Sequence, residues 1–134
     1  MDEAKILGML KLNPIAIKNI DNPTEEMKII ALKRDGLLLR YIENTTKEME
    51  EIAIKSNPRA IEFVENPSEE MMKYAVLAGW SNLNYIKKPS YDVIKLAIEQ
   101  RGWAIQYVKE VAEELQIMAV RKDYDSIKYI KEPS

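Results

Sequence analysis

Four pairs of adjacent glutamates are the polar feature of this sequence that best suits chemistry. They are Glu25-Glu26, Glu50-Glu51, Glu69-Glu70 and Glu113-Glu114. Two converging carboxylates can bind a hard cation or share acid–base work. Three of the pairs, however, occupy one position of a repeat at the expected start of a helix, where the helix dipole already favours acidic side chains. We therefore expect helix-start acids, and no catalytic, cofactor-binding or metal-binding residue.

The composition removes most other reactive groups. The 134 residues include no histidine and no cysteine, which excludes imidazole or thiolate metal sites, disulfides and cysteine nucleophiles. Twenty basic and 22 acidic residues give a formal charge of −2. The acidic N-terminus does not suit a signal peptide, and the longest uncharged run, residues 74–86, is too short to span a bilayer. We expect a non-enzymatic, cytoplasmic protein without membrane contact.

An internal repeat of 22 residues sets the position of all these side chains. Shifting the chain by 22 aligns an alanine column, which consists of Ala31, Ala53, Ala75, Ala97 and Ala119. No insertion or deletion interrupts the six repeats, which are residues 1–22, 23–44, 45–66, 67–88, 89–110 and 111–132. Such regularity is typical of stacked repeat proteins, so we expect residues 1–134 to form a single domain.

Each repeat has the pattern of two short helices. The first begins at sequences such as Asn66-Pro67-Ser68-Glu69-Glu70, with Asn or Ser as the cap and proline in the first turn. The second begins after a capping residue at Asn13-Pro14, Asp35-Gly36, Asn57-Pro58 and Asp123-Tyr124. Helices this short are marginal alone, so stacking must stabilise them. The sequence predicts an all-α fold, an α-solenoid of about six 22-residue helix-turn-helix repeats.

These repeats resemble a known family. The segments NPTEEMKIIALKRDGLLLRYIEN, NPSEEMMKYAVLAGWSNLNYIKK and IAIKSNPRAIEFVEN are similar to a short helical repeat of bacterial and bacteriophage proteins, a domain of unknown function with an N-P-[ST]-E-E signature. The resemblance covers essentially the whole chain and implies no catalytic residues. It implies a phage or mobile-element protein that binds and inhibits a host defence protein. Residues 78–82 and Val111-Ala112 depart from the pattern, which leaves two helix caps in doubt.

The central repeats carry large apolar residues at positions that should be exposed. Trp80 replaces a proline or glycine, Trp103 stands where other repeats have mixed residue types, Leu77 replaces a basic residue and Tyr91 replaces a first-turn glutamate. Large aromatic residues dominate binding hot spots, so these four residues are our candidate anchors for a protein partner. The alternative, that the tryptophans cover the groove between repeats, is equally open.

Charged residues next to these anchors indicate how a partner could be oriented. One column is acidic at Asp21, Glu43 and Glu65 but basic at Lys87 and Lys109. Such a bipolar edge would orient a charged protein, and we include Lys87 and Lys109 in the candidate site.

Two further columns suit a nucleic-acid partner. The aromatic column, which consists of Tyr41, Phe63, Tyr85, Tyr107 and Tyr129, could stack bases, although packing at the edge of the core is the favoured interpretation. The basic column contains Lys11, Lys33, Arg34, Lys55, Arg121 and Lys122. It could follow phosphates, but basic residues are also expected at helix ends. Nucleic-acid binding stays an alternative that the net charge disfavours.

The last repeat suggests self-association. Its last apolar residues are Tyr129 and Ile130, and we expect no further segment after Pro133-Ser134 to cover the final hairpin. Solenoids normally need a polar terminal repeat, so we expect a homodimer through this end, or a self-assembling structural protein as a further alternative.

Overall fold

The computed structural model describes residues 2–130 of the chain, which contain twelve helices and no strand. Ten-residue α-helices alternate with six-residue 3₁₀ helices throughout these residues. The first six elements are α1 (Glu3–Leu12), η1 (Pro14–Asn19), α2 (Glu25–Arg34), η2 (Gly36–Tyr41), α3 (Lys47–Ser56) and η3 (Pro58–Phe63). The next six are α4 (Glu69–Ala78), η4 (Trp80–Tyr85), α5 (Tyr91–Gln100), η5 (Gly102–Tyr107), α6 (Glu113–Lys122) and η6 (Tyr124–Tyr129). The prediction of an all-α, helical-repeat fold is confirmed.

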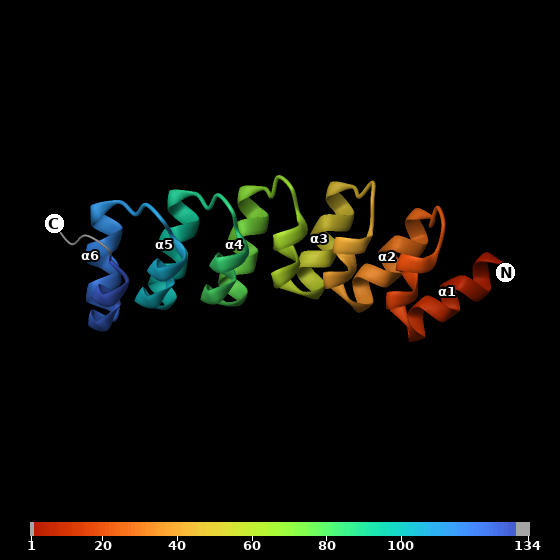
Figure 1. Cartoon of the computed structure of the whole chain (residues 1–134), viewed down its shortest axis with the longest axis horizontal. Coiled ribbons are helices and arrows are strands. Elements are labelled where there is room, and N and C mark those ends of the chain that lie inside the picture. Colours follow the sequence, from red (N-terminus) through yellow and green to blue (C-terminus); the bar gives the residue numbers. More distant parts are fainter. Residues whose placement is uncertain (1, 131–134) are drawn as a thin grey trace. The chain divides into compact units, whose positions relative to one another are not determined.

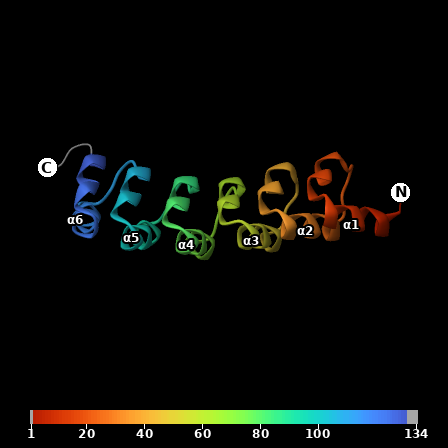
Figure 2. The same ribbon diagram turned by 90° about the horizontal axis from the view of Figure 1, so that it is seen from below.

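The residues group into two compact units, Met1–Asn66 (unit 1) and Pro67–Ser134 (unit 2). The boundary lies between the third and fourth 22-residue repeats, so each unit contains three repeats. Within each unit the α-helices pack in chain order, and each 3₁₀ helix that is followed by an α-helix of the same unit packs on that helix (Figure 1). Figure 2 shows that the α-helices of a unit form one layer and its 3₁₀ helices another. The expectation of one domain over residues 1–134 stays a prediction.

Side-chain caps start five of the α-helices. The caps are Asp2, Thr24, Thr46, Ser68 and Ser90, and each accepts a hydrogen bond from the backbone N–H three residues later. Ser68 therefore caps α4 as predicted, but the position predicted for proline is wrong. Pro67 lies before the cap, where its fixed φ suits the extended entry, and Glu69 and Glu70 occupy the first turn.

The second helix of each repeat is a 3₁₀ helix, and its caps agree only partly with the prediction. Asp35 and Asn57 accept a hydrogen bond from the N–H two residues later. The side chains of Asn13 and Asp123 cap nothing, which corrects those two predictions. The carboxylate of Asp123 instead accepts the N–H of Gly102 in the preceding repeat.

The two doubtful caps are missing, as the departures from the repeat indicated. Gly79 before η4 and Ala112 before α6 make no side-chain capping bond. Near the first, the amide of Asn82 donates to the Ala75 carbonyl at the end of α4, 2.9 Å away. Near the second, the amide of Gln116 donates to the Val111 carbonyl, also at 2.9 Å. Local side chains thus satisfy backbone groups at both irregular positions.

The core of each unit follows the repeat columns. The alanine column is fully buried at all five positions, which confirms that helices approach closely there. A second buried column from the 3₁₀ helices contains Ile17, Leu39, Ile61, Leu83 and Ile105, but its sixth member, Ile127, is 54% exposed. Of the helices within residues 2–130, none combines the length and the apolar character that crossing a bilayer requires.

Candidate functional site

Three large aromatic side chains meet on the 3₁₀ layer of unit 2. Trp80 begins η4, while Trp103 and Tyr107 both belong to η5. The Trp80 ring lies 6.5 Å from the Trp103 ring, edge to face, and 6.2 Å from the Tyr107 ring, nearly parallel. These are the favourable geometries of aromatic pairs. All three side chains are half-buried, and we call them the aromatic cluster.

Trp103 is held in this cluster by polar contacts from its own and the next repeat. Its indole N–H donates to the Asp125 carboxylate at 2.7 Å. The Arg101 guanidinium lies 3.9 Å from the centroid of the indole, and its Nε is 3.4 Å from the Asp123 carboxylate. These contacts fix the orientation of the ring. Trp103 therefore covers part of the junction between two repeats, and its exposed surface is held rigidly.

A groove of about 630 Å³ adjoins the cluster in unit 2. Tyr107 and Lys109 line it together with Ile105, Val108 and the half-buried Tyr129. Tyr107 therefore belongs both to the aromatic cluster and to the groove wall. The structure thus brings two predicted residues, Trp80 and Trp103, into contact and places a third, Lys109, beside a ring that Trp80 touches.

Three other residues of the predicted site, the anchors Leu77 and Tyr91 and the orienting Lys87, lie apart from these contacts. Leu77 is 62% exposed on α4, and Lys87 is exposed after η4. Tyr91 begins α5, and its hydroxyl donates to the Glu114 carboxylate at 3.1 Å. Desolvation, followed by this hydrogen bond, raises the pKa of Tyr91 above its ordinary value. Within residues 2–130, no hydrogen bond, ion pair or ring contact joins Leu77, Tyr91 or Lys87 to the aromatic cluster.

The predicted self-association residues lie at the last described 3₁₀ helix. Tyr129 and Ile130 are half-buried, whereas Pro133-Ser134 lie outside the described residues. Ile130 lines a second hollow of about 360 Å³ together with the exposed Ile117 and Ile127. Ile117 and Ile127 were not among the predicted residues. The column of Ile127 is buried in every other repeat, so its exposure was not expected.

The aromatic column lies at the edge of the core, as the favoured interpretation predicted, and four of its members are half-buried, namely Phe63, Tyr85, Tyr107 and Tyr129. Its rings lie on the 3₁₀ layer with partial exposure, and Tyr41 is 43% exposed. In η1 to η5 the third to last residue already fills the core, so the last residue lies farther out. The basic column, by contrast, lies in the exposed last turns of the α-helices, as the dipole argument predicted.

The sequence columns could not show which residues touch across repeats. Trp80 and Trp103 are separated by 23 residues, as are Tyr91 and Glu114. Comparing residues 23 apart in the sequence would have paired these side chains, but the repeat columns compare residues 22 apart. Trp103 and Asp125, like Arg101 and Asp123, are 22 residues apart, and these contacts were missed because a column compares residue types and does not show contacts.

The glutamate pairs do not come together as a metal site within residues 2–130. Within residues 2–130, no group of three or more acidic residues has an arrangement that could hold a metal ion. Glu25, Glu69 and Glu113 each begin an α-helix, as the dipole argument predicted. Glu50 is half-buried within α3, where desolvation and, to a lesser extent, the charge of Glu65 raise its pKa.

The chain matches no protein-family model, no curated protein and no solved structure. The resemblance to phage and bacterial repeats therefore stays a prediction from the sequence.

Proposed function

We propose that the protein is a non-enzymatic binding module that holds a protein partner through the aromatic cluster of unit 2. The observation that carries this proposal is the contact of Trp80 with Trp103 and Tyr107 beside an open groove. Rigid aromatic side chains supply large contact area at low entropic cost, and they are enriched at the centres of protein interfaces.

The polar surroundings of the cluster favour a protein partner. Lys109 lines the groove, but Glu110 lines it as well, so the groove has no net excess of positive charge. A phosphate backbone requires several cations in sequence. A protein surface with mixed charges around an apolar centre is matched better by this arrangement, in which the charges mainly orient the partner.

The resemblance to phage and bacterial repeats extends the proposal to a specific role. A small repeat protein of a phage or mobile element would inhibit a host defence protein by covering a surface that this protein needs. In this role the module requires affinity and rigidity, and no reactive group.

A parallel binding experiment tests the class of partner. Immobilised protein is incubated with bacterial lysate at increasing salt, and with labelled single- and double-stranded DNA and RNA. We expect specific retention of a protein that weakens only modestly between about 50 and 200 mM salt, whereas phosphate-tracking complexes lose orders of magnitude in affinity over this range. Retention of nucleic acid alone, with steep salt dependence, would overturn the proposal.

A further inference from the structure

We propose that unit 1 carries a second, independent binding surface, which accepts an extended acidic peptide of polyproline II conformation. The surface consists of Lys18, Arg40, Tyr41 and Phe63, and we call it the basic–aromatic ladder. All four residues belong to the 3₁₀ layer, at or next to the ends of η1, η2 and η3.

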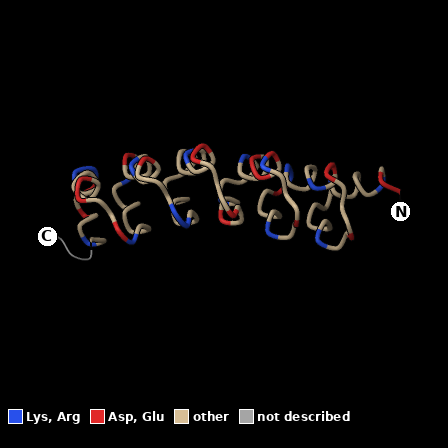
Figure 3. The backbone as a smooth tube through the Cα atoms, turned by 90° about the horizontal axis from the view of Figure 1, so that it is seen from above, with Lys and Arg blue, Asp and Glu red and all other residues tan. Residues whose placement is uncertain are grey.

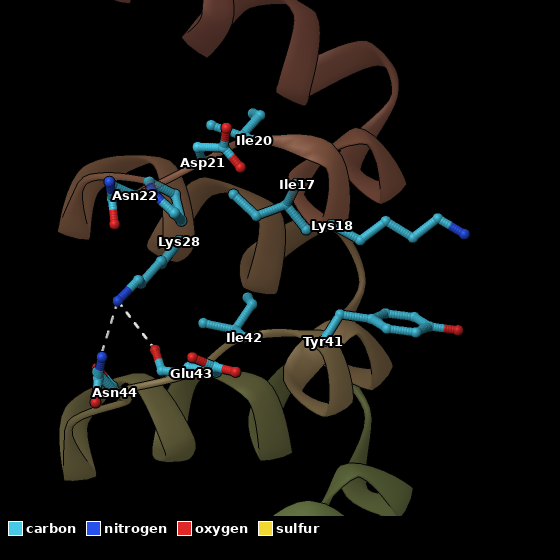
Figure 4. A pocket seen from close by; sticks show the side chains of 11 residues that line it. Ile17, Lys18, Ile20, Asp21, Asn22, Lys28, Tyr41, Ile42, Glu43 and Asn44 are labelled. Atoms are coloured by element: carbon cyan, nitrogen blue, oxygen red, sulfur yellow. Dashed lines mark hydrogen bonds between the residues drawn. The ribbon is translucent and has the colours of Figure 1, made fainter.

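Cations and aromatic rings alternate along this ladder. The Lys18 ammonium lies 5.5 Å from the Tyr41 ring centroid, and the Arg40 guanidinium lies 5.1 Å from the same centroid. Arg40 is also 5.6 Å from the Phe63 ring, so it lies near two rings at once. Figure 4 shows the side chains of Lys18 and Tyr41 extending in the same direction. Contacts within about 6 Å restrict a flexible cation without neutralising it.

The two cations have no acidic partner within the part of the chain that the structure describes. Neither Lys18 nor Arg40 lies within ion-pair distance of a carboxylate there, and both side chains are exposed. Positive charge that is oriented but unpaired favours an anionic ligand. Lys28, in contrast, is occupied, because its ammonium donates to the backbone carbonyls of Glu43 and Asn44.

The arrangement of acidic residues in unit 1 argues against a nucleic-acid ligand. The loops after η1 and η2 carry the exposed Asp21 and Glu43, which line the same pocket of about 380 Å³ as Lys18 and Tyr41. Figure 3 shows basic residues on these two 3₁₀ segments and acidic residues in the loops that follow them. A phosphate backbone would meet both signs of charge. A peptide with single, spaced carboxylates can contact the cations and avoid the loops.

The repeat spacing indicates the conformation of the peptide. Neighbouring packed helices are about 8–10 Å apart, and η1, η2 and η3 pack in succession. A polyproline II helix advances about 9 Å per turn of three residues, so every third side chain lies on the same side. A carboxylate at every third position would therefore meet Lys18 and Arg40 in turn. The Tyr41 ring, which both cations approach, and the Phe63 ring, which Arg40 approaches, suit the proline residues, as in other aromatic-lined proline-binding grooves.

Fluorescence anisotropy with the whole chain tests this proposal. The probe is a labelled (Glu-Pro-Pro)₄ peptide, and the matched control is (Gln-Pro-Pro)₄, which keeps the conformation but not the charge. We expect the acidic peptide to bind about tenfold more tightly, and Lys18→Gln and Arg40→Gln each to weaken it about fivefold, which is the upper range for an exposed ion pair. Arg40→Glu should lose (Glu-Pro-Pro)₄ and gain (Lys-Pro-Pro)₄.

A control variant tests whether any loss of positive charge weakens binding, and an oligonucleotide tests whether the surface prefers nucleic acid. Lys55→Gln removes the same charge from an exposed residue of α3 and should leave the affinity unchanged. Equal binding of both peptides, or equal losses in Arg40→Gln and Lys55→Gln, would overturn the proposal. Tighter binding of a dT₁₂ oligonucleotide that is lost in Arg40→Gln would overturn it too, in favour of nucleic acid. Trp80→Ala should leave the affinity for the peptide unchanged, because Trp80 lies outside the basic–aromatic ladder. The peptide result is therefore independent of the test of the proposed function.

Discussion

Trp103 shows how a single residue can serve both packing and recognition. Its N–H is satisfied by Asp125 and its face by Arg101, so the indole cannot reorient without losing both contacts. The sequence left open whether the tryptophans fill the groove between repeats or bind a partner. The structure shows that Trp103 contacts Asp125 of the next repeat, as a residue that covers the junction between repeats would. Its indole is also partly exposed, so it is accessible to a partner.

Glu50 offers a pH-dependent prediction at the residue scale. Its pKa is raised in the folded chain, so the folded state holds this proton more tightly than the unfolded state does. The ionised carboxylate therefore lowers stability once the pH rises through its folded pKa. We expect Glu50→Gln to raise the melting temperature at pH 7 but not at pH 3, where the carboxyl is protonated in both states. Because Glu50 is only half-buried, the increase should be small.

Thermal melts of Glu50→Gln and Glu51→Gln at both pH values check this prediction. Glu51 is the exposed neighbour, and its replacement changes the net charge equally. An equal increase in both variants would show that net charge, and not the burial of Glu50, is responsible.

At the scale of elements, the contact between a 3₁₀ helix and the next α-helix depends on two glycines. The N–H of Gly36 donates to the Ser56 hydroxyl at 3.1 Å, and the N–H of Gly102 donates to the Asp123 carboxylate at 2.8 Å. A Cβ at Gly36 would overlap the Ala53 carbonyl oxygen, and one at Gly102 would overlap the Ala119 carbonyl oxygen. These helices approach too closely for any side chain.

We expect Gly36→Ala and Gly102→Ala each to lower the free energy of unfolding by about 1–3 kcal/mol, the usual cost of overpacking. Gly8→Ala is the matched control, because a Cβ there meets nothing within 4 Å. It lies within α1 and should stabilise the chain by up to about 1 kcal/mol through helix propensity. Urea denaturation measures all three changes, and a neutral Gly36→Ala would contradict the close approach.

Sequence patterns predicted the elements well and their contacts poorly. The alanine column follows from the 22-residue periodicity and the Ser68 cap from local chemistry, both of which can be read from the sequence. The 3₁₀ geometry of the second helix is not visible there, because six residues satisfy an α or a 3₁₀ pattern equally. The pairing of Trp80 with Tyr107 depends on how one repeat is offset from the next, and this offset is a property of packing.

At the scale of the whole molecule, each unit has its own nearest-neighbour packing. Repeats two and five have neighbours on both sides within their own unit, so their amide protons should exchange most slowly with solvent. Hydrogen exchange resolved by mass spectrometry should then show two maxima of protection. A single maximum over repeats three and four would contradict this prediction and is the result that one continuous domain requires.

Self-association is a further prediction at this scale. Ile117 and Ile127 are 46% and 54% exposed around a hollow that Ile130 also lines. Burying such apolar surface in a closed dimer is favourable. We expect sedimentation velocity to detect a dimer at high micromolar concentration and Ile127→Glu to abolish it. A wild-type chain that stays monomeric over this range would refute the prediction.

The most direct test of the proposed function compares two tryptophan variants with a matched aromatic control. Tyr124 is 84% exposed on η6 and makes no contact with the aromatic cluster, so Tyr124→Ala removes a ring outside the site. Once a protein partner is captured, titration calorimetry should show that Trp80→Ala and Trp103→Ala each weaken its binding by about 2 kcal/mol or more, as expected of hot spots. Tyr124→Ala should bind normally, and helicity should be unchanged in all three. If both tryptophan variants instead bind as tightly as the wild type but melt earlier, the tryptophans only fill the groove and the assignment of the site is wrong.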